Sequence, residues 1–156
     1  DQDLSKLKMR MDIVPVSIAL AQAANESGWG TSRFALEGNA LFGQWTWSKK
    51  GILPKNQDPD KTHKIMQFQV LKASVRAYKN NLNTHSAYGE FREARARLRE
   101  DKKQIIGLYL TKYLKNYASI GEKYVKILND IIQKNSLTDF DNSNLLSTKL
   151  KKGIAL

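Results

Sequence analysis

The longest apolar stretch of the chain runs from Ile13 to Ala24 and predicts a buried helix. Its residues are apolar or small on nearly every side, which is typical of a helix that other elements surround. Pro15 suits the first turn of this helix, and Gly28 suits a left-handed cap after its last turn. The stretch is too short to cross a bilayer. We therefore expect a central helix that ends near residue 27.

Most of the remaining chain also follows a helical period. Apolar spacing predicts a short helix over 4–11, and "TSRFALEG" predicts one or two helical turns that end at Gly38. In the last helix, Ser119 and Glu122 have the spacing of a capping box. Four helices are expected after position 70, over 71–82, 88–98, 105–113 and 119–131.

A segment of different character separates the two helical parts. Residues 39–62 are rich in Gly, Pro, Asn and Asp, and long loops of this kind are often functional. The alternation over 63–70 predicts a strand that pairs back on "LFGQWTW". We expect a mostly helical α+β domain over 1–136 with a small β-lobe inserted after the central helix. A polar, loosely packed tail over 137–156 is expected to follow.

Composition and charge narrow the function classes. The 26 Lys and Arg against 15 Asp and Glu give a net charge of +11, which suggests an acidic partner such as nucleic acid, a membrane surface or an anionic wall polymer. The basic residues are scattered and interleaved with acids, which argues against nucleic acid. Without cysteine, disulfides and thiolate metal sites are excluded. His63 and His85 lack a carboxylate at ligand spacing, so we expect no metal and no cofactor.

Glu26 is the first candidate for chemistry, because it lies where the buried helix gives way to a Gly-Trp-Gly turn. The negative end of the helix dipole and the apolar neighbours both disfavour a carboxylate anion. A carboxyl group that keeps its proton near neutral pH can act as a general acid. The competing interpretation is a solvated glutamate at a helix end.

Aromatic residues gather around this acid in the sequence. Aromatic faces beside a carboxylate are what a sugar-binding cleft requires. Trp29 is a candidate wall beside Glu26, although core packing is the favoured interpretation for it. Trp45 and Trp47 alternate in a polar, glycine-bounded segment, so at least one of them is expected to face solvent.

Four separated blocks of the sequence resemble one known family. They are "ALAQAANESGWGTSRFA", "NALFGQW", "FQVLKASVRAYKNNLNTHSAY" and "NYASIGEKYVKILNDII". Together they resemble the glucosaminidases of glycoside hydrolase family seventy-three, bacterial cell-wall hydrolases, and in particular the Bax-type proteins of Gram-negative bacteria. The resemblance covers about positions 10–135. It implies a lysozyme-like fold and a periplasmic or cell-envelope location, although no export signal is visible in the chain.

The resemblance also implies roles for individual residues. Glu26 corresponds to the general acid, and Tyr117 to a tyrosine near the reactive sugar. A packed tyrosine at a helix junction is the competing interpretation for Tyr117. Ser27 and Ser32 are expected to be local caps. The expected substrate-binding residues are Trp29, Asn39, Phe42, Gly43, Gln44, Trp45 and Trp47.

The second catalytic group stays open. Many family members offer a second carboxylate in the β-lobe, where this chain has Asp58 and Asp60 in "DPDKTHKIM", a stretch that also suits a turn. Glu37 is an outside candidate. Alternatively, the 2-acetamido group of the sugar attacks in a substrate-assisted reaction, with Tyr117 holding it.

The leading hypothesis is a monomeric endo-β-N-acetylglucosaminidase that hydrolyses peptidoglycan glycan strands, without stable membrane insertion. A muramidase or lytic transglycosylase on the same fold is the first alternative. A non-catalytic module that binds cell wall or nucleic acid is the second.

Overall fold

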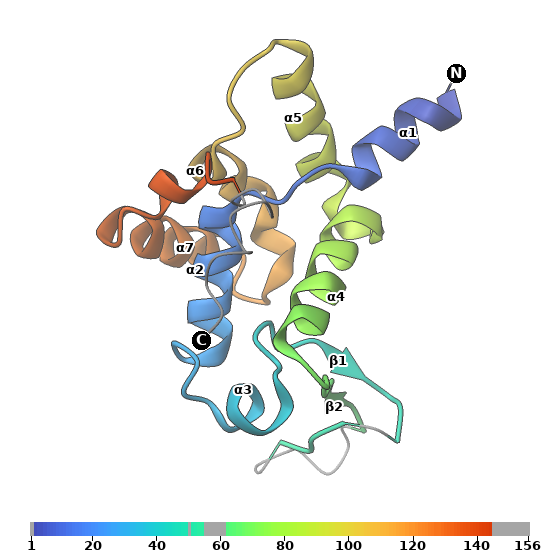
Figure 1. Ribbon diagram of the computed structural model, residues 1–156, viewed down its shortest axis with the longest axis vertical. Coiled ribbons are helices and arrows are strands. Elements are labelled where there is room, and N and C mark those ends of the chain that lie inside the picture. The colour runs from blue at the N-terminus through green and yellow to red at the C-terminus, as the bar shows by residue number, and fades with distance from the viewer. Residues whose placement is uncertain (1, 50, 55–61, 145–156) are drawn as a thin grey trace, which may run out of the picture.

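The computed structural model describes residues 2–49, 51–54 and 62–144. This part of the chain forms seven α-helices, a two-stranded sheet and three short 3₁₀ helices (Figure 1). The α-helices are α1 (Gln2–Met11), α2 (Val16–Ser27), α3 (Arg33–Gly38), α4 (Leu71–Thr84), α5 (Gly89–Glu100), α6 (Gly107–Leu110) and α7 (Glu122–Lys134). The strands are β1 (Trp45–Thr46) and β2 (Lys64–Ile65), and the 3₁₀ helices are Ser86–Tyr88, Thr111–Tyr117 and Leu137–Phe140.

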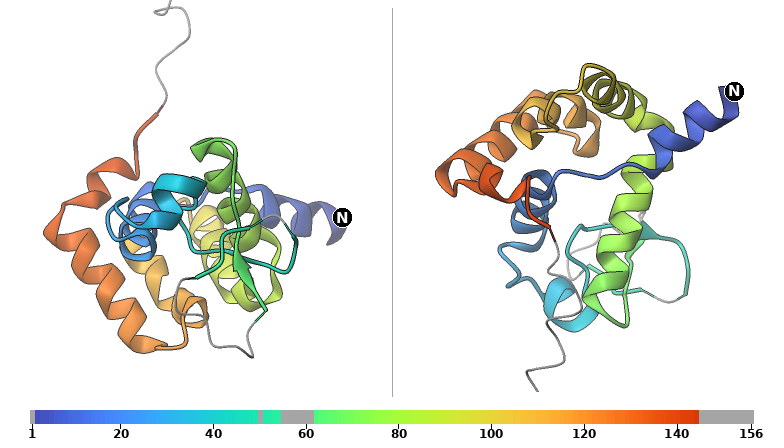
Figure 2. Two further views of the ribbon diagram at one scale, coloured as in Figure 1. Left: turned by 90° about the horizontal axis from the view of Figure 1, so that it is seen from below. Right: turned by 45° about the horizontal axis from the view of Figure 1, so that its top comes forward.

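Helix α2 is the centre of the molecule, as its unbroken apolar pattern predicts. It lies between α7 and α4 in both Figure 1 and Figure 2, and Ile18 and Ala21 expose no surface. Pro15 precedes the first turn, and Gly28 closes the last turn with φ +57°, donating its N–H to Ala24 O. Both ends of the predicted helix are therefore confirmed.

The predicted β-lobe forms, with shorter strands than expected. β1 and β2 are antiparallel, with Trp45 opposite Ile65. Ile52 extends this pairing through two backbone hydrogen bonds to Ile65, of 2.8 and 2.9 Å. Gly51 is required beside this pair, because a Cβ there would lie 2.9 Å from Lys64 Cβ. Together with α3, the sheet forms the lower lobe in Figure 1.

Two predictions about the C-terminal half are wrong. The helix expected over 105–113 divides into the short α6 and the 3₁₀ helix that follows it. The capping box also does not form, because α7 begins directly after Gly121, which turns the chain at φ +53° without a side-chain cap. Ser119 lies before this turn.

The beginning of the predicted tail is packed. The Asp141 carboxylate accepts hydrogen bonds of 2.8 Å from the Ser17 N–H, the Ser17 hydroxyl and the Gly107 N–H. It thereby satisfies backbone donors in the first turns of two helices, α2 and α6, which would otherwise lack partners. The expectation of loose packing is therefore wrong for residues 137–141, and 145–156 lie outside the described residues.

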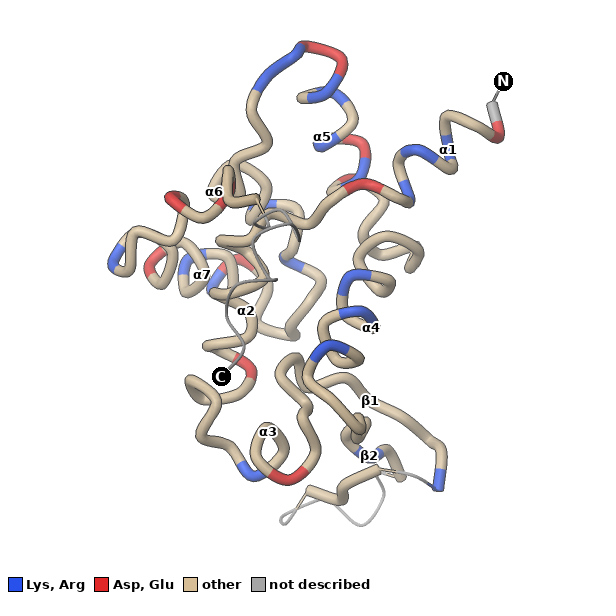
Figure 3. The backbone as a smooth tube through the Cα atoms, in the orientation of Figure 1, with Lys and Arg blue, Asp and Glu red and all other residues tan. Residues whose placement is uncertain are grey.

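Charged residues are spread over several helices. Figure 3 shows Lys and Arg on α1, α4, α5 and α7, with Asp and Glu interleaved on α5 and α7. Among the described residues, no helix is both long and apolar enough to cross a bilayer.

Candidate active site

The turn after α2 positions Glu26. Ser27 is buried, and its hydroxyl donates to Ala23 O while accepting from the Gly30 N–H at 2.7 Å. These two hydrogen bonds fix the turn directly after Glu26. The backbone of Glu26 itself lies in the last turn of α2. The Ser32 hydroxyl caps α3 by accepting from the Ala35 N–H. The prediction that both serines are local caps is confirmed.

The Glu26 carboxyl group has two sides with different surroundings. Oε1 accepts hydrogen bonds from the Tyr124 hydroxyl at 2.8 Å and from Asn25 Nδ2 at 3.1 Å. Oε2 faces Gly43, where a Cβ would lie 3.6 Å away. Gly43 has φ +59°, a conformation that glycine adopts without strain. One oxygen is thus held by donors while the other borders a residue without a side chain.

An open cleft of about 680 Å³ surrounds this half-buried glutamate. Its walls come from the end of α2, the segment that leads into β1, the end of α4 and the turn before α7. Aromatic, amide and hydroxyl groups predominate in the lining. The lining residues are Glu26, Phe42, Gly43, Gln44, Trp45, Asn81, His85, Tyr88, Asn116, Tyr117, Ala118 and Ser119. Glu26 is the one carboxylate in this described lining, which contains no Lys or Arg.

Stacked aromatic rings pack against the residues that line the cleft. Phe42 and Tyr78 are parallel, with ring centroids 3.9 Å apart. Tyr117 stacks on Tyr124 at 5.7 Å, and its hydroxyl donates to Phe42 O at 3.2 Å. The segment that carries Gly43 is therefore fixed against the tyrosines that flank Glu26.

The tyrosines around Glu26 stay protonated. Burial, followed by the negative charge of Glu26, raises the pKa of both Tyr117 and Tyr124 well above the usual value. Burial also raises the pKa of Tyr88. These hydroxyls are therefore neutral hydrogen-bond donors at any pH at which the protein is expected to work, and no ammonium or guanidinium group lines this described cleft.

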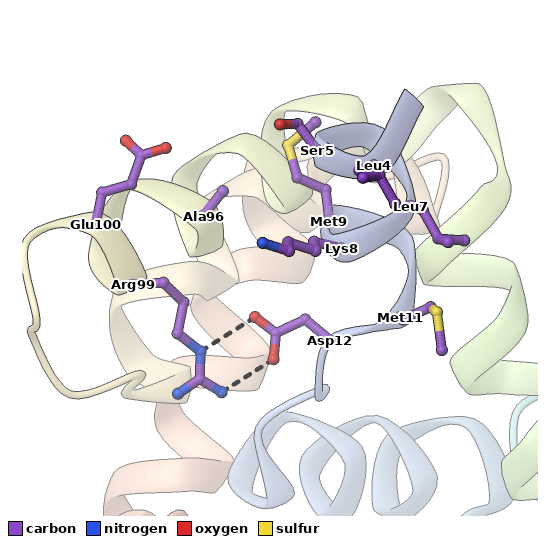
Figure 4. Close-up of a pocket in the computed structure, with 10 residues that line it drawn as sticks. All are labelled: Leu4, Ser5, Leu7, Lys8, Met9, Met11, Asp12, Ala96, Arg99 and Glu100. Atoms are coloured by element: carbon purple, nitrogen blue, oxygen red, sulfur yellow. Dashed lines mark hydrogen bonds and ion pairs between the residues drawn. The ribbon is translucent and has the colours of Figure 1, made fainter. Parts of the chain in front are cut away.

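A second cavity, of about 760 Å³, lies between α1 and α5 (Figure 4). Its apolar wall includes Leu4, Leu7 and Met11. The Asp12 carboxylate in it accepts two hydrogen bonds from Arg99, of 2.9 and 3.2 Å. Because this carboxylate is already paired with a guanidinium, we place the candidate active site in the Glu26 cleft.

A comparison with protein families decides what kind of domain carries this cleft. A family model described as "Mannosyl-glycoprotein endo-beta-N-acetylglucosaminidase" matches residues 2–137. The chain belongs to this glucosaminidase family. Membership implies a glycoside hydrolase, and the predicted resemblance is confirmed at the family level.

The glucosaminidase domain is also similar to Protein bax of Escherichia coli (strain K12). The two are 39% identical over 126 residues, which are 81% of this chain and 44% of that protein. The chain thus spans less than half the length of this relative. No solved structure gives a significant match.

The structure brings together most of the predicted site residues. Glu26 and Tyr117 share the cleft of the glucosaminidase domain with four of the predicted substrate-binding residues, which are Phe42, Gly43, Gln44 and Trp45. Trp47 is 73% exposed outside the described cleft lining. Asp58 and Asp60 lie outside the described residues.

Three other predicted candidates take different places. The expectation that Trp29 packs in the core is wrong, because it is 64% exposed. It follows Gly28 in a second left-handed position, at φ +57°, beyond the last residue of the buried helix. Asn39 ends α3, and its amide donates to Phe68 O at 3.0 Å instead of lining the cleft. Glu37 is exposed and pairs with Arg33.

Several residues in the cleft lining or bonded to Glu26 escape prediction from the sequence. Tyr124 has the spacing of a core residue on α7, and that spacing does not indicate where its hydroxyl points. The sequence does not indicate that His85 lines the cleft, as it does with Asn81 and Tyr88. The described residues contain no group of three or more His, Cys, Asp or Glu that could hold a metal ion.

Proposed function

We propose that this glucosaminidase domain is an endo-acting β-N-acetylglucosaminidase that hydrolyses peptidoglycan glycan strands. The observation that carries the proposal is Glu26, the one carboxylate in the described lining of an open cleft whose other walls are aromatic, amide and hydroxyl groups. Such walls suit a sugar, because ring faces stack on aromatics and hydroxyls bond to amides.

In this proposal Glu26 protonates the oxygen of the leaving sugar as the glycosidic bond breaks. Its half-buried position and its two hydrogen-bonded neighbours orient the carboxyl group toward the cleft. Trp45, which is exposed at the rim and stacked on His63 at 4.1 Å, offers a ring face to the glycan. A cleft that is open to solvent suits binding along a strand, as endo-cleavage requires.

The attack on C1 is proposed to be substrate-assisted. The acetamido carbonyl oxygen attacks C1 while the glycosidic bond breaks and Glu26 gives its proton to the leaving oxygen. Water then opens the cyclic intermediate, returning a proton to the Glu26 carboxylate and giving the free sugar end. Asn116, Tyr117 and Ser119 supply amide and hydroxyl groups in the cleft lining that could hold the acetamido group. This route needs one protein carboxylate, which agrees with the described lining.

The same proposal extends to fold and location. Helices that enclose a cleft beside a small β-lobe support a lysozyme-like arrangement. A positively charged domain of this family fits work on a polyanionic cell envelope, and we propose the bacterial periplasm as its place of action.

The experiment is a digestion of purified peptidoglycan by the wild type and Glu26→Gln, followed by borohydride reduction and mass spectrometry. We expect reduced N-acetylglucosamine ends from the wild type only. The substitution keeps the shape of the side chain, so both proteins should have the same unfolding temperature within a few degrees.

Other products would redirect the assignment. Reduced muramic acid ends would indicate a muramidase, and anhydro ends a lytic transglycosylase. Intact glycan with both proteins would leave a binding module. Equal cleavage by both would remove Glu26 from the role of general acid.

A further inference from the structure

Three buried side chains connect the core to Glu26 by hydrogen bonds. The Tyr78 hydroxyl donates to Gln22 Oε1 at 2.7 Å, and Gln22 Nε2 donates to the Tyr124 hydroxyl at 2.9 Å. The Tyr124 hydroxyl in turn donates to Glu26 Oε1 at 2.8 Å. Tyr78, Gln22 and Tyr124, which we call the Gln22 relay, are almost completely inaccessible to solvent.

The direction of the Gln22 relay follows from the requirement that buried donors have acceptors. Gln22 Oε1 is the one acceptor that the structure gives the Tyr78 hydroxyl among the described residues. If the Gln22 amide were turned over, its nitrogen would face Tyr78 and leave that buried O–H without an acceptor, which is unfavourable. The Tyr124 O–H would then also be drawn to Gln22 and away from Glu26. The observed orientation is therefore the favourable one.

We propose that the Gln22 relay determines which oxygen of Glu26 carries the transferable proton. Oε1 accepts two hydrogen bonds, from Tyr124 and Asn25, which use both of its lone pairs. The proton consequently resides on Oε2, the oxygen beside Gly43. This inference rests on the proposed role of Glu26 as general acid and makes the relay members positioning residues.

The same contact stabilises the anion that proton transfer creates. As the proton leaves Oε2, negative charge develops on the carboxyl group, and the fixed Tyr124 O–H is already directed at it. The titratable groups that face Glu26 are Tyr78, Tyr88, Tyr117 and Tyr124, with His85 in the same cleft. The raised pKa values of the four tyrosines keep their hydroxyls protonated, so Tyr124 remains a donor.

The first test is Tyr124→Phe, which removes one hydroxyl and keeps the ring stacked on Tyr117. A hydrogen bond to a charged group contributes about 1.5–3 kcal/mol, so we expect kcat to fall about 10- to 100-fold, with KM changed less than twofold. The carboxylate form also loses a donor, which favours the protonated form. The alkaline limb of the pH–rate profile should therefore move to higher pH.

The second test is Tyr78→Phe, which removes a hydroxyl that hydrogen-bonds to Gln22 and to neither Glu26 nor Tyr124 among the described residues. It removes the group that holds the Gln22 amide in one orientation, so we expect kcat to fall about three- to tenfold, a smaller effect than that of Tyr124→Phe. The alkaline limb should move in the same direction. This variant keeps the inference testable if Tyr124→Phe fails to fold.

The matched control is Thr111→Val. Thr111 is buried beside α7, and its hydroxyl bonds to Asn129 Oδ1 at 2.6 Å and to Leu108 O at 2.9 Å, so among the described residues neither bond reaches the Gln22 relay. We expect lower stability in this variant but wild-type kcat and pH profile. If both tyrosine variants behave like Thr111→Val while Glu26→Gln is inactive, the relay inference is refuted and the proposed function stands. If Glu26→Gln is active, the proposed function fails and the relay inference fails with it.

Discussion

The buried side chain of Arg95 on α5 hydrogen-bonds to the end of α1 and the segment after it, and the contribution of these bonds to stability can be tested. It exposes no surface, and its guanidinium donates to the backbone carbonyl of Ile13, to Met9 O at 2.5 Å and to Asn83 Oδ1 at 2.8 Å. Its Nε lies 3.6 Å from Asp12 Oδ2. Burial lowers the pKa of Arg95 to about 10, opposed by the charge of Asp12, so the group is still a cation at neutral pH.

Arg95→Met keeps the aliphatic stem and removes every donor. Three acceptors then lose their partner at about 1–3 kcal/mol each, while the burial of apolar methionine offsets part of that loss. Removing one member of a buried ion pair typically costs about 3–5 kcal/mol. We expect the free energy of unfolding to fall by about 3–5 kcal/mol, a large share of the about 5–15 kcal/mol of an ordinary domain.

Urea unfolding followed by far-UV circular dichroism measures this loss. The control is Arg97→Met on the same helix, since Arg97 is 67% exposed and lies 4.0 Å from Glu93 Oε2. An exposed pair of this kind should change stability by less than about 0.5 kcal/mol. Equal unfolding midpoints for the two variants would show that the Arg95 contacts do not stabilise the fold.

Two further predictions concern pH and glycan binding. Burial raises the pKa of Asp12. The hydrogen bonds from Arg99 and the Ile13 N–H, together with the nearby guanidinium charges, lower it by more, so the net pKa is below the usual value. Its stabilising contribution is therefore present above the unfolded pKa of about 4 and is lost as pH falls through the lower folded pKa, so the urea midpoints of wild type and Asp12→Asn should converge as the pH falls below about 4. Trp45→Ala and Trp47→Ala should both fold, because the rings are 60% and 73% exposed. Trp45→Ala should weaken binding in a glycan sedimentation assay more than Trp47→Ala does, because Trp45 is the one of the two in the described cleft lining. Wild-type binding by both variants would remove these rings from the binding surface.

The local pattern of apolar and polar residues predicts those helices and strands whose bounds depend on their own sequence. The apolar run and Gly28 define α2, and period-two alternation locates the strand that pairs with Trp45. Glu26 can be singled out as the candidate acid because its sequence context is unusual. Several residues that line the cleft around Glu26 lie in the four sequence blocks that resemble the family.

Contacts between distant segments escape such prediction. The apolar spacing of α7 places Tyr124 in the core, and nothing in that spacing indicates that its hydroxyl emerges beside Glu26. Gln22 looks like a polar interruption in an apolar helix, although it bonds to two tyrosines from different helices. Hydrophobicity alone predicts a buried Trp29, whereas the residue lies in a left-handed turn after α2 and is exposed.

The hydrogen bond between Glu26 and Tyr124 joins residues 98 positions apart in the chain. A ribosome releases the segment that carries the acid long before it releases α7, and the closure of so long a loop is slow compared with local helix formation. The hydrogen bond from Tyr124 that orients Glu26 therefore forms only after α7 has docked. Under the proposed function, a nascent or truncated chain without α7 should be inactive, and activity would then report the completion of folding.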